Sequence, residues 1–208
     1  MKIVSWNCQA KPPYNKYGFT KEKAEFIDKY NADIYIIQEA TSYDVELLEN
    51  FKINKAWYGD NIDSIYGIGI FSNKFKIELL TEHNPDFRYV IPYKIFNEKY
   101  NFNLFAVWTK DRDKSNKKIE YTEQIWNAIN YSNYNGILKS SVLLAGDFNS
   151  NNFWNDEYVI KKIPSHNDII DKLKEYNIES VYHKYFNCEN GNENDPTLLL
   201  INTVIIAR

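Results

Sequence analysis

Four polar residues follow three apolar segments of the chain, and their types are those that bind metal ions and activate water. Asn7 follows KIVSW, Glu39 follows DIYIIQ, and Asp147 with Asn149 follows SVLLAG. A carboxylate next to a buried apolar strand is costly unless it is paired or holds a cation. Taken singly, each has an ordinary explanation, because strands end in turns and Asp and Asn are turn residues. Their joint occurrence favours one site to which all three segments contribute.

The segment GDFN suggests how two of these residues act together. Gly146 would let the backbone turn sharply as the strand ends. In an extended segment, Asp147 and Asn149 are two positions apart and point to the same side. One side chain can then act as a base, while the neighbouring amide donates a hydrogen bond to a phosphoryl oxygen.

The segments that carry these residues predict one α/β domain in which strands outnumber helices. A strand over 2–6, a helix over 21–30 and a strand over 33–38 form a β-α-β unit, and ligands bind at the carboxyl ends of such strands. Further strands are expected at 66–72, 77–80, 89–96, 102–108 and 141–145, and further helices at 44–51, 121–134 and 168–177. Polar loops are expected at 110–118 and 187–195.

Length and composition fit an ordinary globular protein. A chain of 208 residues is most simply a single domain, 1–208, and its net charge of −3 argues against coating nucleic acid by bulk electrostatics. The two cysteines, Cys8 and Cys188, lack metal-site spacing and predict free thiols. The N-terminus has no signal-peptide pattern, and no stretch approaches the roughly 20 apolar residues of a membrane span, so a cytoplasmic location is expected. His83 is expected on the surface.

The segments VSWNCQ, IIQEA and LLAGDFNS, in this order, resemble the leading motifs of the endonuclease/exonuclease/phosphatase superfamily. The resemblance extends over residues 1–197, including SHNDIIDKLKEYNIESVYH, and implies a four-layer sandwich of two mixed β-sheets flanked by helices. The superfamily includes deoxyribonucleases, abasic-site endonucleases, sphingomyelinases and inositol-polyphosphate phosphatases. Membership implies hydrolysis of a phosphate ester with Mg²⁺ or Mn²⁺.

The resemblance also implies a role for each matched residue. Glu39 would bind the metal directly, and Asn7 would ligate it or hydrogen-bond beside it. Asp147 would orient or deprotonate the attacking water, and Asn149 would hold a non-bridging phosphate oxygen. Mg²⁺ suits such a site because it takes few protein carboxylates and keeps several waters. Arg88, just before YVIPYKIF, is a candidate phosphate contact or an ordinary surface arginine.

The sequence departs from the family pattern in two places. Trp108 stands in FAVWT, where relatives carry a His or Tyr that touches the phosphate; it is a candidate substrate contact, but an indole cannot act as an acid or base. The late-strand Asp and the terminal Ser-Asp-His of the family are absent, and 198–208 is a divergent tail. The hypothesis is a truncation or frameshift near codon 198 that removes the last strands and weakens activity. The other reading frames of the DNA beyond that codon would test it, because a frameshift predicts that one of them encodes the missing motifs.

The function expected first is hydrolysis of DNA or RNA phosphodiester bonds. A second hypothesis is a non-catalytic remnant that still binds a metal or nucleic acid, and a third is a phosphoesterase acting on a small molecule or lipid headgroup. No protein partner is inferred.

Overall fold

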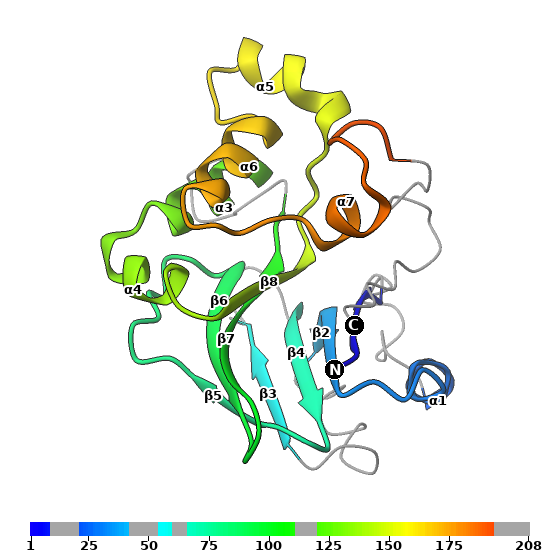
Figure 1. Ribbon diagram of the computed structural model, residues 1–208. Helices are drawn as coiled ribbons and strands as arrows, with labels where there is room; N and C mark the ends of the chain where they lie inside the picture. The colour runs from blue at the N-terminus through cyan, green and yellow to red at the C-terminus, as the bar shows by residue number, and fades with distance from the viewer. Residues whose placement is uncertain (9–20, 42–53, 60–65, 111–119, 194–208) are drawn as a thin grey trace.

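Two four-stranded sheets packed face to face form the centre of the protein (Figure 1). The computed structural model describes residues 1–8, 21–41, 54–59, 66–110 and 120–193. The strands are β1 (Ile3–Asn7), β2 (Ile34–Thr41), β3 (Asn54–Tyr58), β4 (Tyr66–Ser72), β5 (Lys76–Leu79), β6 (Val90–Phe96), β7 (Asn101–Trp108) and β8 (Val142–Asp147). The helices are α1 (Lys21–Asp28), α3 (Tyr121–Ile129), α4 (Asn135–Leu138), α5 (Asn155–Ile160), α6 (His166–Lys174) and α7 (Val181–Phe186).

Both sheets are mixed. The first has the order β1-β2-β4-β3 and the second β5-β6-β7-β8. Only β1 with β2 and β7 with β8 pair in parallel among the described strands; the other neighbours are antiparallel. The edge strands β1 and β8 contact each other across the sandwich. This contact brings together the two strand ends that carry Asn7 and Asp147.

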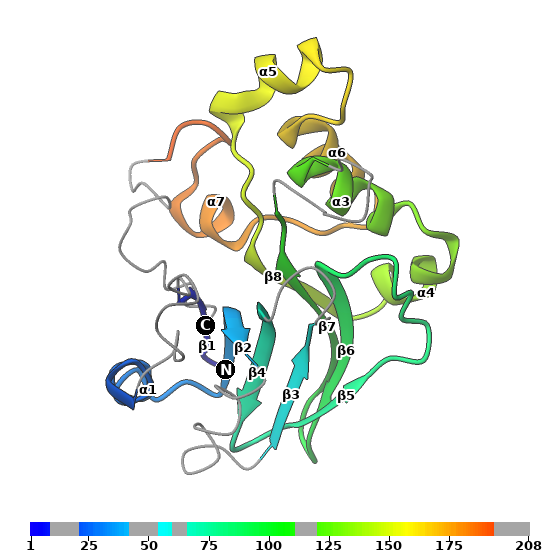
Figure 2. The same ribbon diagram turned by 180° about the vertical axis from the view of Figure 1, so that it is seen from behind.

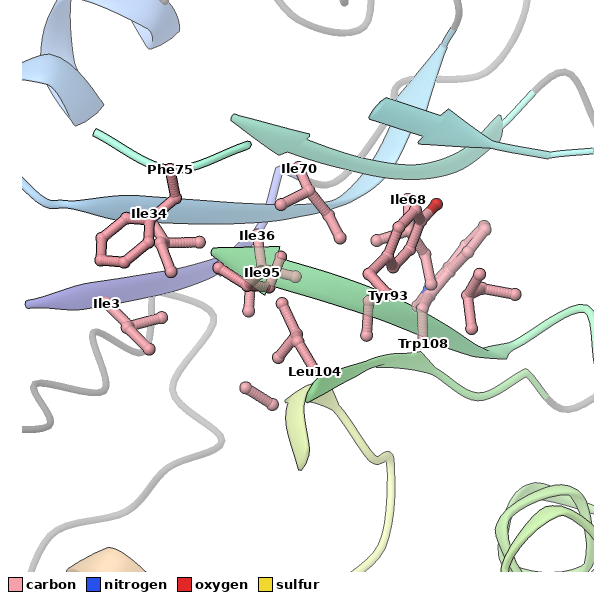
Figure 3. Close-up of a cluster of buried hydrophobic side chains, with 13 residues drawn as sticks. Ile3, Ile34, Ile36, Ile68, Ile70, Phe75, Tyr93, Ile95, Leu104 and Trp108 are labelled. Carbon is pink, nitrogen blue, oxygen red and sulfur yellow. The ribbon is translucent and has the colours of Figure 1, made fainter. Parts of the chain in front are cut away.

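Strand periodicity divides the apolar side chains between three layers of core. In β7, Leu104, Ala106 and Trp108 point between the sheets, where they interleave with side chains of the first sheet (Figure 3). Phe105 and Val107 point the other way, toward the helices. The layer between the sheets excludes water from both inner faces, and each outer layer from one outer face. Burial of an aliphatic or aromatic side chain contributes about 1.5–3 kcal/mol.

Helices cover the outer face of each sheet. Ala24 and Ile27 of α1 pack on the outer face of the first sheet, and α3, α4 and α6 pack on the second. Figures 1 and 2 show α1 and the α3–α6 group on opposite sides of the sandwich. The predicted four-layer architecture is therefore confirmed. None of the helices in the described ranges is long and apolar enough to cross a membrane.

The strands differ from the predicted ones at their ends. The strand predicted over 66–72 is confirmed without change, whereas β2 and β8 run further than predicted and contain Glu39 and Asp147. Asn7 and Asp147 therefore pair within the sheets, and Glu39 lies at an interruption of the pairing, instead of following the strands. Strand β3 was not predicted, because NKAWY shows no alternation of buried and exposed residues.

The helix predicted over 121–134 is wrong beyond Ile129. Asn130 caps the helix, and its side-chain amide donates to the carbonyl of Trp126 at 2.9 Å, which ends the regular pattern. A 3₁₀ turn at Ser132–Tyr134 and the short α4 follow. Helices α5 and α7 were not predicted. The predicted helix at 44–51, residues 111–118 of the predicted loop and the tail at 198–208 lie outside the described residues.

His83 is not the surface histidine that the sequence predicts. Both ring nitrogens are buried and have no hydrogen-bond partner in the described structure, and the ring meets Tyr58 edge-on at 4.6 Å. Burial lowers the pKa of His83 below its ordinary value of 6.5, because the charged imidazolium is poorly solvated there. The prediction failed because Tyr58 belongs to β3, which the sequence does not reveal. Cys8 and Cys188 are free thiols, as predicted.

The buried His83 predicts a loss of stability at mildly acidic pH. Below about pH 6.5 the unfolded chain binds a proton at this histidine more readily than the folded one, so the free energy of unfolding falls as the pH falls. Replacement of His83 by Phe keeps the contact with Tyr58 and removes this titration. Urea unfolding between pH 7.5 and 5 should show a smaller loss of stability in His83→Phe than in the wild type. Equal losses of stability in His83→Phe and the wild type would contradict the lowered pKa of His83.

Candidate active site

Asn7 joins the two carboxylates of the site. Its side-chain amide Nδ2 donates to Glu39 Oε1 at 3.1 Å and to Asp147 Oδ2 at 2.8 Å. All three residues are partly buried, so they are held by the fold but still accessible to solvent. Both of these bonds use the amide nitrogen of Asn7; in such a side chain the oxygen, Oδ1, is the atom whose lone pairs can ligate a cation.

A bulge in β2 positions Glu39. The parallel register of β1 with β2 pairs Asn7 with Gln38. The antiparallel register of β2 with β4 shifts between Gln38 and Ala40, so the strand pairing skips Glu39. Glu39 has a φ of 59°, a left-handed conformation that is rare for residues other than Gly, Asn and Asp. Such a conformation costs about 1–3 kcal/mol, and bulges commonly redirect a side chain beside an active site.

Gly146 lets β8 approach β7 closely enough to present Asp147. Its φ is 145°, and a Cβ atom at this position would lie 1.9 Å from the carbonyl oxygen of Val107. Val107 pairs with Gly146 and Trp108 with Asp147 in the parallel ladder. The glycine was predicted to permit a sharp turn after the strand; it instead permits close pairing within the strand.

Asn149 is held against Asp147 by a local turn. Its backbone N–H donates to Asp147 Oδ1 at 3.1 Å, and its side-chain Nδ2 donates to Asp147 Oδ2 at 3.1 Å and to the carbonyl of Thr109 at 2.9 Å. The predicted extended segment is wrong here, because Asn149 has a φ of 44°. The two side chains still lie together, so Asn149 orients the carboxylate of Asp147.

Asn7, Glu39, Asp147 and Asn149 therefore converge as the sequence predicts. Trp108 lies next to them through its pairing with Asp147, but the residue is only 4% exposed and belongs to the core between the sheets. Arg88 lies in the turn before β6, next to Tyr89, whose ring is 6.0 Å from that of Trp108.

Several residues around the site were not singled out from the sequence. Cys8 Sγ donates to the backbone carbonyl of Glu39 at 3.4 Å and helps to hold the bulge. Ser150 Oγ lies 2.8 Å from His166 Nδ1, and Asn155 accepts a hydrogen bond from the backbone N–H of His166. Burial lowers the pKa of His166. Ser150 was within reach of sequence reasoning, because it is the last residue of LLAGDFNS; the contact with His166 depends on the tertiary fold.

The donor set of the site consists of carboxylates and amides. Within the described ranges, no three His, Cys, Asp or Glu side chains converge as a metal-binding group. The oxygens of Glu39, Asp147 and Asn7 are hard ligands of the kind that Mg²⁺ and Mn²⁺ take, together with several waters.

Comparison with known proteins places the chain in a family. A model of the endonuclease/exonuclease/phosphatase family matches residues 4–197, and the chain belongs to that family. Its members are hydrolytic phosphoesterases. No curated protein sequence matches the chain.

Solved structures share the fold at low sequence identity. Humanized D. rerio TDP2 has a TM-score of 0.52 and 18% identity, with 79% of this chain and 72% of that chain covered. D. rerio TDP2 complexed with single-strand DNA product has a TM-score of 0.55 and 15% identity, with 100% and 80% covered. The endonuclease domain of TRAS1, a telomere-specific non-LTR retrotransposon, has a TM-score of 0.52 and 17% identity, with 84% and 71% covered.

Proposed function

We propose that the protein is a divalent-metal-dependent phosphodiesterase that cleaves DNA or RNA. The observation that carries this proposal is the bridge from Asn7 to both Glu39 and Asp147, which joins the ends of β1, β2 and β8 in one polar cluster. Two carboxylates that share one amide donor repel each other unless positive charge lies between them. A bound cation would supply that charge, and the amide of Asn7 supplies part of it.

The residues present fit Mg²⁺ or Mn²⁺. Glu39 would be the direct ligand, with Asn7 Oδ1 beside it, and the strained backbone of Glu39 is the kind of feature that a functional constraint maintains. A divalent ion bound there supplies electrostatic stabilisation of the charge that develops on a phosphoryl group.

Asp147 is the proposed acceptor of the proton from the attacking water. Its Oδ2 accepts from Asn7 and Asn149, and its Oδ1 accepts from the backbone N–H of Asn149. These hydrogen bonds fix the carboxylate in one orientation, and a fixed base is more effective because its geometry needs no reorganisation during reaction. The side-chain amide of Asn149 donates to Asp147 and Thr109, so we assign Asn149 this orienting role in place of the predicted contact with a phosphate oxygen.

Nucleic acid is the proposed substrate class. Two structures with the same fold support this: TDP2 complexed with single-strand DNA product and the endonuclease domain of TRAS1. The net charge of −3 predicts modest affinity, set by contacts near the site instead of a broad basic face.

The test of the proposed function is nicking of supercoiled plasmid in Mg²⁺, with and without EDTA. We expect slow nicking that EDTA stops, and at least about tenfold less nicking by Glu39→Gln at limiting metal, because the weaker ligand lowers metal affinity. Glu78→Gln, an exposed glutamate on β5, is the matched control and should behave as the wild type.

Other outcomes would point elsewhere. Nicking that persists in Glu39→Gln at the wild-type rate would indicate a contaminant or a different site. Tight DNA binding without cleavage would favour the non-catalytic remnant. Hydrolysis of a small phosphate ester without nicking would favour a small-molecule or lipid-headgroup substrate.

A further inference from the structure

A lysine lies over the ring of Trp108, the residue that pairs with Asp147. The ammonium nitrogen of Lys110 is 3.9 Å from the centre of the Trp108 ring and 5.6 Å from that of Tyr89. The two rings meet edge-on at 6.0 Å. A cation over an indole face is attracted by the ring quadrupole, and this attraction helps to hold the flexible lysine side chain over the ring.

The alternation of β7 explains why the lysine is at the site. Leu104, Ala106 and Trp108 point into the layer between the sheets, and Asp147 continues the row of Ala145 in β8 at the same end of that layer. Lys110 is two residues beyond Trp108 and lies over its ring, at the end of the layer where Asp147 is presented. Asp147 and the ammonium of Lys110 therefore lie at the same end of this layer.

The backbone of Lys110 is fixed at both of its polar groups. Its N–H donates to Gln124 Oε1 at 3.1 Å, and its carbonyl accepts from Gln124 Nε2; Gln124 lies on α3 and is only 8% exposed. The preceding residue, Thr109, donates its N–H to the carbonyl of Asp147 at 3.0 Å and accepts from Asn149. The lysine is therefore anchored to the same hydrogen-bond network as the proposed base.

We propose that Lys110 binds a non-bridging oxygen of a substrate phosphodiester in nucleic acid. Trp108 itself presents little surface, so the ammonium that covers it is what a ligand at this end of the layer would meet. An ammonium is a strong donor to phosphate, and its hydrogen bond to a charged oxygen is among the stronger ones in proteins. This inference rests on the proposed function, because it assigns a substrate contact to that site.

The test is the affinity for a fluorescein-labelled single-stranded DNA of eight nucleotides, measured by fluorescence anisotropy in Ca²⁺ at several salt concentrations. Lys110→Gln should bind at least about tenfold more weakly, and the slope of log affinity against log salt should fall by about 0.7, the value for one phosphate contact on a single strand. Lys110→Arg should retain most of the affinity.

Lys99→Gln is the matched control. Lys99 also lies over an aromatic ring, that of Tyr100 at 5.2 Å, but it is exposed in the β6–β7 turn at the other end of the sheet. Its replacement should change neither the affinity nor the salt slope. Thermal unfolding of both variants at the wild-type temperature would show that the fold is intact.

The inference would be overturned if Lys110→Gln and Lys99→Gln had equal effects, or if the wild type did not bind the oligonucleotide. Failure of the proposed function looks different. Affinity that depends on Lys110 without any metal-dependent cleavage would leave this contact standing and remove the catalytic proposal. Metal-dependent cleavage by a protein whose DNA affinity does not depend on Lys110 would support the catalytic proposal and remove the Lys110 contact.

Discussion

Replacing Asp147 with Asn is expected to lower the rate of plasmid nicking by about 10²–10⁴-fold, the range for loss of a general base. The carboxylate accepts hydrogen bonds at both of its oxygens, from Asn7 and Asn149 at Oδ2 and from the backbone of Asn149 at Oδ1. An asparagine has only one acceptor oxygen. Its NH₂ group would therefore face at least one N–H donor in either orientation. The variant loses the base and also the geometry that orients it.

The rate loss must be separated from a loss of folding. Asp171→Asn makes the same chemical change on α6, at a residue whose side chain is 72% exposed and pairs with Lys174 on the same helix. It should nick at the wild-type rate. Single-turnover nicking at saturating Mg²⁺, with unfolding followed by circular dichroism, would compare the two variants. A rate for Asp147→Asn within about threefold of the wild type would remove Asp147 from the proposed role.

Replacing Gly146 with Ala is expected to lower the free energy of unfolding by roughly 3 kcal/mol or more. The added Cβ would lie 1.9 Å from the Val107 carbonyl oxygen, which is a backbone atom and cannot move without breaking the β7–β8 ladder. The φ of 145° adds strain for any side chain. Because this ladder positions Asp147, nicking should also fall.

Gly136→Ala is the control for this substitution. Gly136 lies in α4, and a Cβ there would meet nothing within 4 Å. Alanine should leave stability unchanged or raise it by about 0.4–1 kcal/mol, since it restricts the unfolded chain. Urea unfolding of both variants measures the difference. A change of less than about 1 kcal/mol in Gly146→Ala would contradict the close approach of the two strands.

The convergence of the site could be predicted from sequence because it depends on a local rule. A polar residue at the end of a buried strand lies at the edge of a sheet, and parallel strands such as β1 and β2 present their ends at the same edge. The apolar segments before Asn7, Glu39 and Asp147 were recognisable on composition alone. The contact between β1 and β8 then completed the cluster.

The geometry that makes the site specific depends on pairing between distant segments. The bulge at Glu39 arises from the register of β2 against β4, and the conformation of Gly146 arises from its neighbour Val107. The residues that flank Glu39 and Gly146 in the sequence do not determine either of these features. The burial of His83 depends in the same way on Tyr58.

Lys110 shows an intermediate case. Because side chains alternate along β7, the sequence could have predicted that Lys110 lies on the same side as Trp108, two residues earlier. Its position over the ring also depends on the hydrogen bonds by which Gln124 of α3 holds its backbone. Sequence periodicity predicts the side of a strand to which a residue belongs. It does not predict which helix will hold the loop that follows.

The central claim is that Asn7, Glu39 and Asp147 form a site for a divalent cation, and titration with Mn²⁺ followed by electron paramagnetic resonance tests it most directly. The wild type should bind one Mn²⁺ that Mg²⁺ displaces, and Glu39→Gln should bind it at least about tenfold more weakly while Glu78→Gln binds as the wild type does. Equal Mn²⁺ affinity in the wild type and Glu39→Gln, or no binding by either, would contradict the claim.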